Sequence, residues 1–178
     1  CYAYASEVRA KYLQKLIEFC GPGFDKAFLM SAGTEATEAA LKLMRLNGQK
    51  LGKRRGGILC FEGNWHGRTL GAQMMSSDLS QKDWIGYHDP NIHHLPFPYP
   101  WCEESRQDSR RFFRDSLHRL LLKKNLDLER DFCGIMMETF QGWGAVFYPP
   151  EFVQEVEKFA RESGALLVFD EMQSGFGR

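Results

Sequence analysis

Two carboxylate residues directly follow apolar runs and are the strongest candidates for chemistry in this 178-residue chain. Asp170 follows the run at 166–169, and Glu138 follows the run at 132–137. Such runs are typical of strands buried on both faces of a parallel sheet, and ligands of open α/β sheets bind beyond the carboxyl ends of these strands. An unpaired buried charge is costly, so we expect Asp170 to face a cationic partner or ligand.

A turn of small residues is a candidate anion site. Ser31-Ala32-Gly33-Thr34-Glu35 follows an apolar run at 27–30, which we predict to be a short strand, and it opens a predicted helix. Backbone N–H groups and the positive end of the helix dipole favour phosphate there, and small side chains allow it to approach. Most helix starts of this composition bind nothing, so the turn gains meaning only together with Asp170.

An aromatic residue leaves another predicted strand, at 58–61, in the segment Trp65-His66-Gly67-Arg68-Thr69. The Trp65 ring either lies flat on a planar ligand or closes the edge of the core. We expect His66 to orient this loop and not to act as a general base.

The elements between these segments predict an α/β fold with a mostly parallel central sheet flanked by helices. The strands at 132–137 and 166–169 enclose a helix at about 150–163, which makes a βαβ unit with parallel strands, so Glu138 and Asp170 emerge at the same edge of the sheet. The remaining expected elements are a helix from Val8 that stops at Gly21, a helix after residue 31 with Ala36, Ala39, Ala40, Leu43 and Met44 inward, strands at 73–75 and 92–95, and one amphipathic helix at 103–124.

Composition excludes several classes of function. The chain has 23 basic and 23 acidic residues, so it has no electrostatic footprint for nucleic acid or an anionic membrane surface. Its five cysteines are scattered and never spaced Cys-x-x-Cys, which predicts neither disulfides nor a zinc site and favours a reducing, cytoplasmic compartment. No apolar run approaches the roughly 20 residues of a membrane helix. The adjacent His93 and His94 would face opposite sides of a strand, so we predict no metal site.

An apolar strand followed by Asp-Glu occurs in two protein families. A P-loop ATPase also needs a Gly-x-x-x-x-Gly-Lys-[Ser/Thr] loop. The nearest stretch, from Gly48 to Arg54, has only three residues between its glycines and Arg54 where a hydroxyl is required. In contrast, the segments 32–36, 65–69, 138–142 and 168–178 together resemble, in order, those of the class III (ornithine, acetylornithine and GABA type) pyridoxal-phosphate-dependent aminotransferases.

This resemblance implies the cofactor pyridoxal 5'-phosphate and a fold of type I, with residues 1–178 forming part of the cofactor-binding large domain. It also implies roles. Asp170 would keep the pyridine nitrogen protonated so that the ring accepts electrons. The other residues implied in cofactor binding are Ala32, Gly33 and Thr34 at the phosphate, Trp65 and Met172 on the two ring faces, His66 in the loop, Gln173 at the phenolic oxygen and Glu138 beside the cofactor. The sequence departs from the family at Ala32, usually serine, and at Trp65, usually phenylalanine or tyrosine.

The resemblance also implies what lies outside the chain. The sequence starts at Cys1 without methionine and ends at Arg178, so we expect a fragment whose Schiff-base lysine lies downstream of Arg178. A homodimer and ping-pong transfer from an amino donor to a 2-oxo acid are implied as well. A non-catalytic, cofactor-binding module or decayed homologue stays open as the alternative. Where many members have Gln-Gly-Glu, whose glutamate pairs with a substrate-binding arginine, this chain has Gln141-Gly142-Trp143, which predicts a different donor preference.

Overall fold

The computed structural model describes residues 4–177, which divide into two compact units between Ser31 and Ala32. The first unit contains α1 (Glu7–Cys20), whose N-cap Ser6 accepts a hydrogen bond from the Arg9 backbone and which ends at Gly21 with a positive φ of 83°. No residue of α1 is buried. The strand predicted at 27–30 is wrong, because that segment is irregular and mostly exposed and has no partner strand in the described chain.

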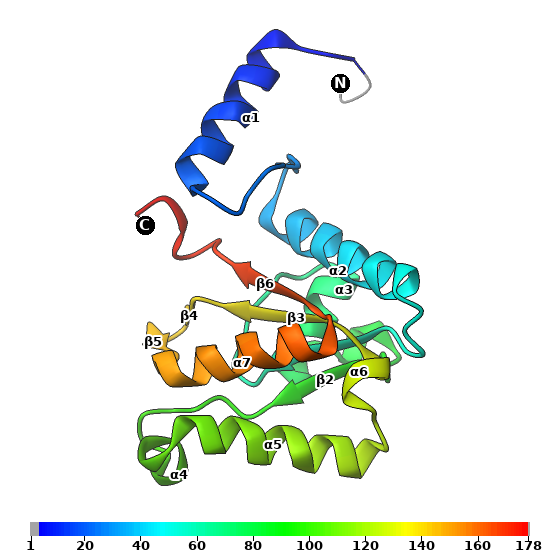
Figure 1. The fold of residues 1–178 in the computed structure, drawn as a ribbon, viewed down its shortest axis with the longest axis vertical. Coiled ribbons are helices and arrows are strands. Elements are labelled where there is room, and N and C mark those ends of the chain that lie inside the picture. Colours follow the sequence, from blue (N-terminus) through cyan, green and yellow to red (C-terminus); the bar gives the residue numbers. More distant parts are fainter. Residues whose placement is uncertain (1–3, 178) are drawn as a thin grey trace. The chain divides into compact units, whose positions relative to one another are not determined.

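The second unit is built on a four-stranded parallel sheet (Figure 1). Its strands are β1 (Gly57–Phe61), β2 (Ile92–Leu95), β3 (Phe132–Glu138) and β6 (Leu166–Asp170), in the spatial order β2-β1-β3-β6. All three strand pairs are parallel, which confirms the predicted fold class. Within residues 4–177, no helix combines the length and the apolar character needed to cross a bilayer.

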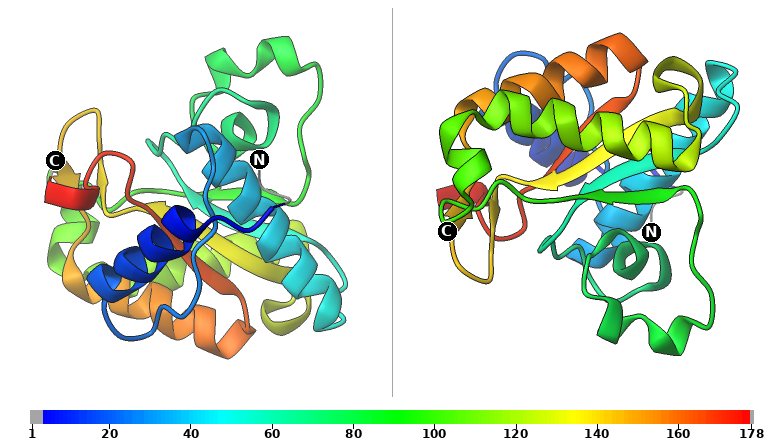
Figure 2. Two further views of the ribbon diagram at one scale, coloured as in Figure 1. Left: turned by 90° about the horizontal axis from the view of Figure 1, so that it is seen from above. Right: turned by 90° about the horizontal axis from the view of Figure 1, so that it is seen from below.

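Helices cover both faces of this sheet (Figure 2). On one face lie α5 (Ser109–Lys124) and α7 (Pro150–Ser163), and on the other lie α2 (Gly33–Lys50) and α3 (Leu70–Met75). The shorter elements are α4 (Glu103–Gln107), α6 (Leu128–Asp131), the hairpin strands β4 (Phe140–Gln141) and β5 (Val146–Phe147), and the 3-10 turns η1 (Leu79–Gln81), η2 (Asp83–Ile85) and η3 (Gly175–Gly177).

The core follows from the alternation of side chains along the strands. On β1, Leu59 and Phe61 pack against α5 and α7, where aromatic side chains such as Phe152 fill the space. The alternate residues Ile58 and Cys60 pack on the α2 face. Alternating burial therefore gives the sheet a core on each side.

Two predicted elements have another form. The segment predicted as a strand at 73–75 belongs to the helix α3, which is buried from Gly71 to Met75. Its apolar run was short, and such runs are ambiguous between strand and helix. The single helix predicted at 103–124 is broken at Asp108, whose side chain accepts from the Arg111 backbone and caps α5.

Two predicted burial patterns are also wrong. On α2 the buried residues are Thr37, Leu41, Met44 and Gly48, so of the positions predicted to point inward only Met44 is fully buried. Thr37 is buried because its hydroxyl donates to backbone carbonyls, which hydropathy does not register. Strand β6 is the edge of the described sheet, and its Leu166 and Phe169 are exposed, so it is not buried on both faces.

Candidate active site

The two carboxylates predicted at the sheet edge are neighbours on adjacent strands. Glu138 and Asp170 are paired residues at the last positions of β3 and β6. Two residues earlier, Met136 and Val168 pack into the core on the α2 face. Since side chains alternate along a strand, Glu138 and Asp170 face the same side of the sheet as these two residues. The βαβ unit thus delivers both carboxylates to the region near the start of α2.

A cavity of about 210 Å³ lies at this edge. It brings together eight of the nine predicted cofactor-binding residues, all except Ala32, and adds Gly67. The lining residues are Gly33, Thr34, Trp65, His66, Gly67, Glu138, Asp170, Met172 and Gln173.

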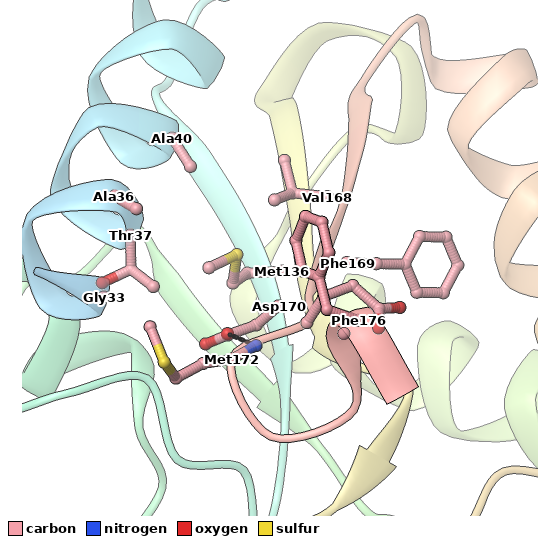
Figure 3. A pocket seen from close by; sticks show the side chains of 12 residues that line it. Gly33, Ala36, Thr37, Ala40, Met136, Val168, Phe169, Asp170, Met172 and Phe176 are labelled. Carbon is pink, nitrogen blue, oxygen red and sulfur yellow. Dashed lines mark hydrogen bonds between the residues drawn. The ribbon is translucent and has the colours of Figure 1, made fainter. Parts of the chain in front are cut away.

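A larger cavity of about 600 Å³ adjoins the first, between α2 and β6, and shares Gly33, Asp170 and Met172 with it (Figure 3). Its wall is largely apolar and includes Ala36 and Val168. Figure 3 shows the Met172 side chain between Gly33 and Asp170. A methyl group on Gly33 would come within 2.2 Å of the Met172 terminal methyl carbon, so the glycine allows this close approach.

The start of α2 has the character of an anion site. Ala32 occupies the N-cap position with extended backbone angles, and no side chain caps the helix there. The first-turn N–H groups therefore receive no acceptor from the cap residue. Thr34 Oγ1 lies 2.7 Å from Thr69 Oγ1 and 3.3 Å from the Thr69 backbone nitrogen, which ties this turn to the loop after β1.

Glycine is required where that loop meets α2. Gly67 has a φ of +124°, and a Cβ on it would lie 2.3 Å from Thr34 Oγ1. Only glycine adopts such a backbone at low cost. The close approach keeps the aromatic loop against the helix start.

The backbone N–H of Trp65 anchors this residue in the loop. Its N–H donates to Glu138 Oε2 at 3.1 Å, and the Arg68 guanidinium lies 5.1 Å from the centre of its ring. The ring is partly buried and lines the smaller cavity. Trp65 thus borders the cavity, and its stacking on a planar ligand stays a prediction.

Glu138 is buried, with 3% of its surface exposed. Burial raises the pKa of Glu138 to about 7, opposed by the hydrogen bond from the Trp65 backbone and assisted by the nearby negative charge of Asp170. A carboxyl group in this state exchanges a proton near neutral pH.

Asp170 has protein partners on both oxygens. Its Oδ1 accepts from the Met172 backbone at 3.1 Å, and its Oδ2 lies 2.9 Å from His66 Nδ1. The His66 backbone is anchored by Ser76 Oγ, to which it donates, and by the Thr37 hydroxyl, which donates to it. His66 therefore contacts Asp170 directly, a more specific position than the loop-orienting role expected from sequence.

Three buried polar residues of the site were not predicted: Asn64, Gln141 and Tyr148. Gln141 Nε2 donates to Asn64 Oδ1 at 3.2 Å, and the Tyr148 hydroxyl donates to the same oxygen at 3.0 Å. They lie 77 and 84 residues from Asn64 along the chain, so no periodicity signals these contacts. The one local sign was the position of Asn64, two residues before His66.

The first glycine of the stretch nearest to a P-loop does not lie in a loop. Gly48 is buried inside α2, where a Cβ would lie 2.4 Å from the Cys133 Cβ. Backbone N–H groups within a helix are already bonded, so this position cannot cradle phosphates.

Comparisons with known proteins identify the family of this chain. The model of the family "Aminotransferase class-III" matches residues 1–178. A 2-aminoadipate transaminase of Pseudomonas putida is 31% identical over 187 residues, covering 99% of this chain and 41% of the relative. An alanine/serine racemase of Pyrococcus horikoshii is 30% identical over 181 residues, covering 97% of this chain and 37% of the relative.

Solved structures share the fold. The crystal structure of an omega-transferase from Vibrio fluvialis superposes with a TM-score of 0.84 at 22% identity, covering 100% of this chain and 42% of that one. The chain spans about two fifths of the length of the curated relatives it matches. Because the family model extends over every residue of the sequence, this chain belongs to the class-III aminotransferases.

Proposed function

We propose that the full-length protein is a pyridoxal-phosphate-dependent aminotransferase, which moves an amino group from an amino acid or amine donor to a 2-oxo acid by a ping-pong mechanism. One observation carries the proposal beyond family membership: the Asp170 carboxylate, the Trp65 ring and Thr34 at the uncapped start of α2 line one cavity. This combination suits a ligand with a cationic ring nitrogen, a planar aromatic body and an anionic tail.

The residues present fit this cofactor. The start of α2 supplies backbone donors for the phosphate without a competing side-chain cap, and Gly33 and Gly67 allow the side chains of Met172 and Thr34 to pack closely at the cavity. A carboxylate has lone pairs for more than two partners, so Asp170 keeps acceptor capacity beyond its bonds to Met172 and His66. When bound, the cofactor supplies an electron sink for the carbanion formed at the substrate carbon.

Each residue has a defined task in this proposal. Asp170 would raise the pKa of the ring nitrogen by its negative charge and so hold a proton on that atom. As the family resemblance implies, Trp65 and Met172 would hold the ring from its two faces, and Gln173 would contact its phenolic oxygen. Glu138 fixes the Trp65 loop through the backbone bond at 3.1 Å and holds a proton of its own near neutral pH.

The lysine that attaches the cofactor is proposed to lie after Arg178. Among the described residues no lysine lines either of the two cavities. A homodimer and a cytoplasmic location belong to the same proposal. The family resemblance supports the dimer, and the free thiols of Cys20, Cys60, Cys102 and Cys133 support a reducing compartment. Sedimentation of the purified protein tests the dimer.

The deciding experiment uses purified full-length protein with pyridoxal phosphate. We expect one cofactor per chain, and we expect an amino donor alone to release one equivalent of its oxo product per site in a single half-reaction, a 2-oxo acid from an α-amino acid and an aldehyde or ketone from an amine. Asp170→Asn should slow this step, whereas Asp115→Asn, an exposed aspartate on α5, should not. If the protein binds stoichiometric cofactor but releases no oxo product from any donor, it is the non-catalytic, cofactor-binding module.

The racemase among the relatives calls for a further measurement. Incubating each enantiomer of a donor without an oxo acid distinguishes the two reactions, since a racemase interconverts the enantiomers with continuous turnover. A transaminase stops after one equivalent. Continuous interconversion would contradict the proposal of amino transfer.

A further inference from the structure

Asp170 is the inner end of a chain of hydrogen bonds that begins at the protein surface. The exposed Trp143 lies at its outer end. Between them lie three side chains that are almost fully buried, Gln141 at 0%, Asn64 at 3% and His66 at 2% exposure. Successive contacts measure 3.0 Å from Trp143 Nε1 to Gln141 Oε1, 3.2 Å from Gln141 Nε2 to Asn64 Oδ1, 3.3 Å from Asn64 Nδ2 to His66 Nε2, and 2.9 Å from His66 Nδ1 to Asp170 Oδ2.

The direction of this chain is set by its outer end. The indole N–H of Trp143 only donates, and the backbone carbonyl of Glu62 only accepts. Both contact the Gln141 amide, the first at Oε1 and the second at Nε2. A reversed amide would set donor against donor and acceptor against acceptor at once, so the orientation of Gln141 is fixed.

Gln141 in turn fixes Asn64. Its Nε2 presents a hydrogen to Asn64, so the atom that it meets must be the oxygen. The hydroxyl of Tyr148 donates to the same oxygen, and burial raises the pKa of Tyr148 well above its usual value, so this donor keeps its proton. The NH₂ group of Asn64 therefore points to the imidazole of His66.

Asn64 then determines which nitrogen of His66 carries the hydrogen. An amide NH₂ only donates, so His66 Nε2 must present its lone pair. The single ring hydrogen is left on Nδ1, where it donates to Asp170 Oδ2. A second hydrogen on Nε2 would point at the NH₂ donor of Asn64. The His66 side chain has no exposed surface, so water does not separate these two donors.

We propose that Asn64, oriented by Gln141, is a positioning residue that keeps His66 a neutral Nδ1–H donor, so that Asp170 retains its full negative charge for its ligand. An imidazolium at His66 would instead neutralise that carboxylate. Only the last step, the effect on the ring nitrogen of the cofactor, rests on the proposed function. The state of His66 itself is a property of the protein without cofactor.

The test is the side-chain ¹⁵N spectrum of His66 in full-length protein at neutral pH, assigned by its loss in His66→Gln. We expect a protonated Nδ1 and an unprotonated Nε2. Asn64→Asp replaces the NH₂ donor by a carboxylate oxygen of the same shape, so we expect both ring nitrogens to become protonated. The matched control is Tyr148→Phe, which removes one of the two donors to Asn64 Oδ1, leaves Gln141 to orient the amide, and should leave both nitrogens unchanged.

Three results would overturn the proposal: a protonated Nε2 in the unsubstituted protein, an unchanged His66 in Asn64→Asp, or the same change in Tyr148→Phe. A general loss of structure would disturb His66 in both variants, so the control separates it from the specific effect. Since the spectrum is recorded without cofactor, its outcome does not depend on the proposed function.

A second measurement connects this residue to chemistry. In the cofactor-loaded protein, Asn64→Asp should slow the donor half-reaction by about tenfold or more, because one unit of ring-nitrogen pKa corresponds to a factor of ten. Bound cofactor should stay near one per chain. If the His66 spectrum changes as expected but the protein never binds the cofactor, the proposed function fails and the assignment of Asn64 stands.

Discussion

Glu138 and Asp170 are register partners on parallel strands, yet their surroundings differ. Glu138 is buried and accepts hydrogen bonds from backbone N–H groups, and burial dominates the shift of its pKa to about 7. Asp170, one strand further toward the sheet edge, has the His66 side chain at 2.9 Å and the Met172 backbone at 3.1 Å. Two carboxylates side by side are best tolerated when one is protonated. In this pair, Glu138 is therefore suited to hold a proton and Asp170 to remain an anion.

The first prediction concerns the Asp170 carboxylate. Asp170→Asn should leave cofactor bound but greatly slow the half-reaction, because an amide cannot hold the ring nitrogen protonated. Each unit of pKa lost on that nitrogen removes about 1.4 kcal/mol of differential stabilisation. Single-turnover absorbance of the full-length protein measures the rate, with Asp115→Asn as control. A rate near that of the unsubstituted protein would refute the role of Asp170.

The second prediction concerns the carboxyl group of Glu138, which holds a proton near neutral pH. The pKa of Glu138 is raised from 4.5 to about 7 in the folded protein, so between these values the native state binds a proton that the unfolded chain has released. Stability contributed by this group consequently falls as pH rises through that window and is constant above it. Glu138→Gln removes the titration and should therefore gain stability relative to the unsubstituted protein as pH rises.

Thermal unfolding at about pH 5 and about pH 8 measures this difference. Glu103→Gln, on the short helix α4, provides a control with the same chemical change outside the sheet. An equal stability difference at both pH values in Glu138→Gln would show that the carboxyl group has no raised pKa.

Part of this site could be predicted because its signals are local. The apolar runs before Glu138 and Asp170, separated by a helix, were enough to place the two carboxylates together. Short-range patterns failed where a segment was ambiguous, as in α3, whose buried face was taken for a strand. The bonds that join Asn64 to Gln141 and Tyr148 could not be predicted, since they depend on how distant loops pack and not on any repeat in the sequence.

The third prediction tests the contact between the aromatic loop and α2. Gly67→Ala combines a strained φ of +124° with a Cβ placed 2.3 Å from Thr34 Oγ1, so it should cost about 1–3 kcal/mol of stability and weaken cofactor binding. The matched control is Gly86→Ala, where φ is also positive at +76° but no atom lies within 4 Å of the added Cβ.

Gly86→Ala should lose only the conformational part, about 1 kcal/mol, with unchanged cofactor affinity. Chemical denaturation and cofactor titration of both variants separate the two effects. If both variants lose the same stability and bind cofactor equally well, the close packing of Gly67 on Thr34 has no role at the site.

The last prediction concerns donor preference. Trp143 is 63% exposed and stands edge-on to Trp101 with ring centres 6.5 Å apart. By the resemblance of its segment to the family, it would occupy the place of the glutamate that pairs with a substrate-binding arginine in many members. An indole cannot form that ion pair, so we expect the carboxylate of the substrate to be accommodated differently here. Trp143→Glu should therefore change the ratio of kcat/KM for ω-amino and α-amino donors.

The control is Trp143→Phe, which removes the indole without adding a charge and so separates loss of the indole from gain of a negative charge. The Glu62 carbonyl still orients Gln141 in both variants, so a shift seen only with glutamate reports on the substrate pocket. A ratio unchanged in Trp143→Glu would show that position 143 does not govern the choice of donor.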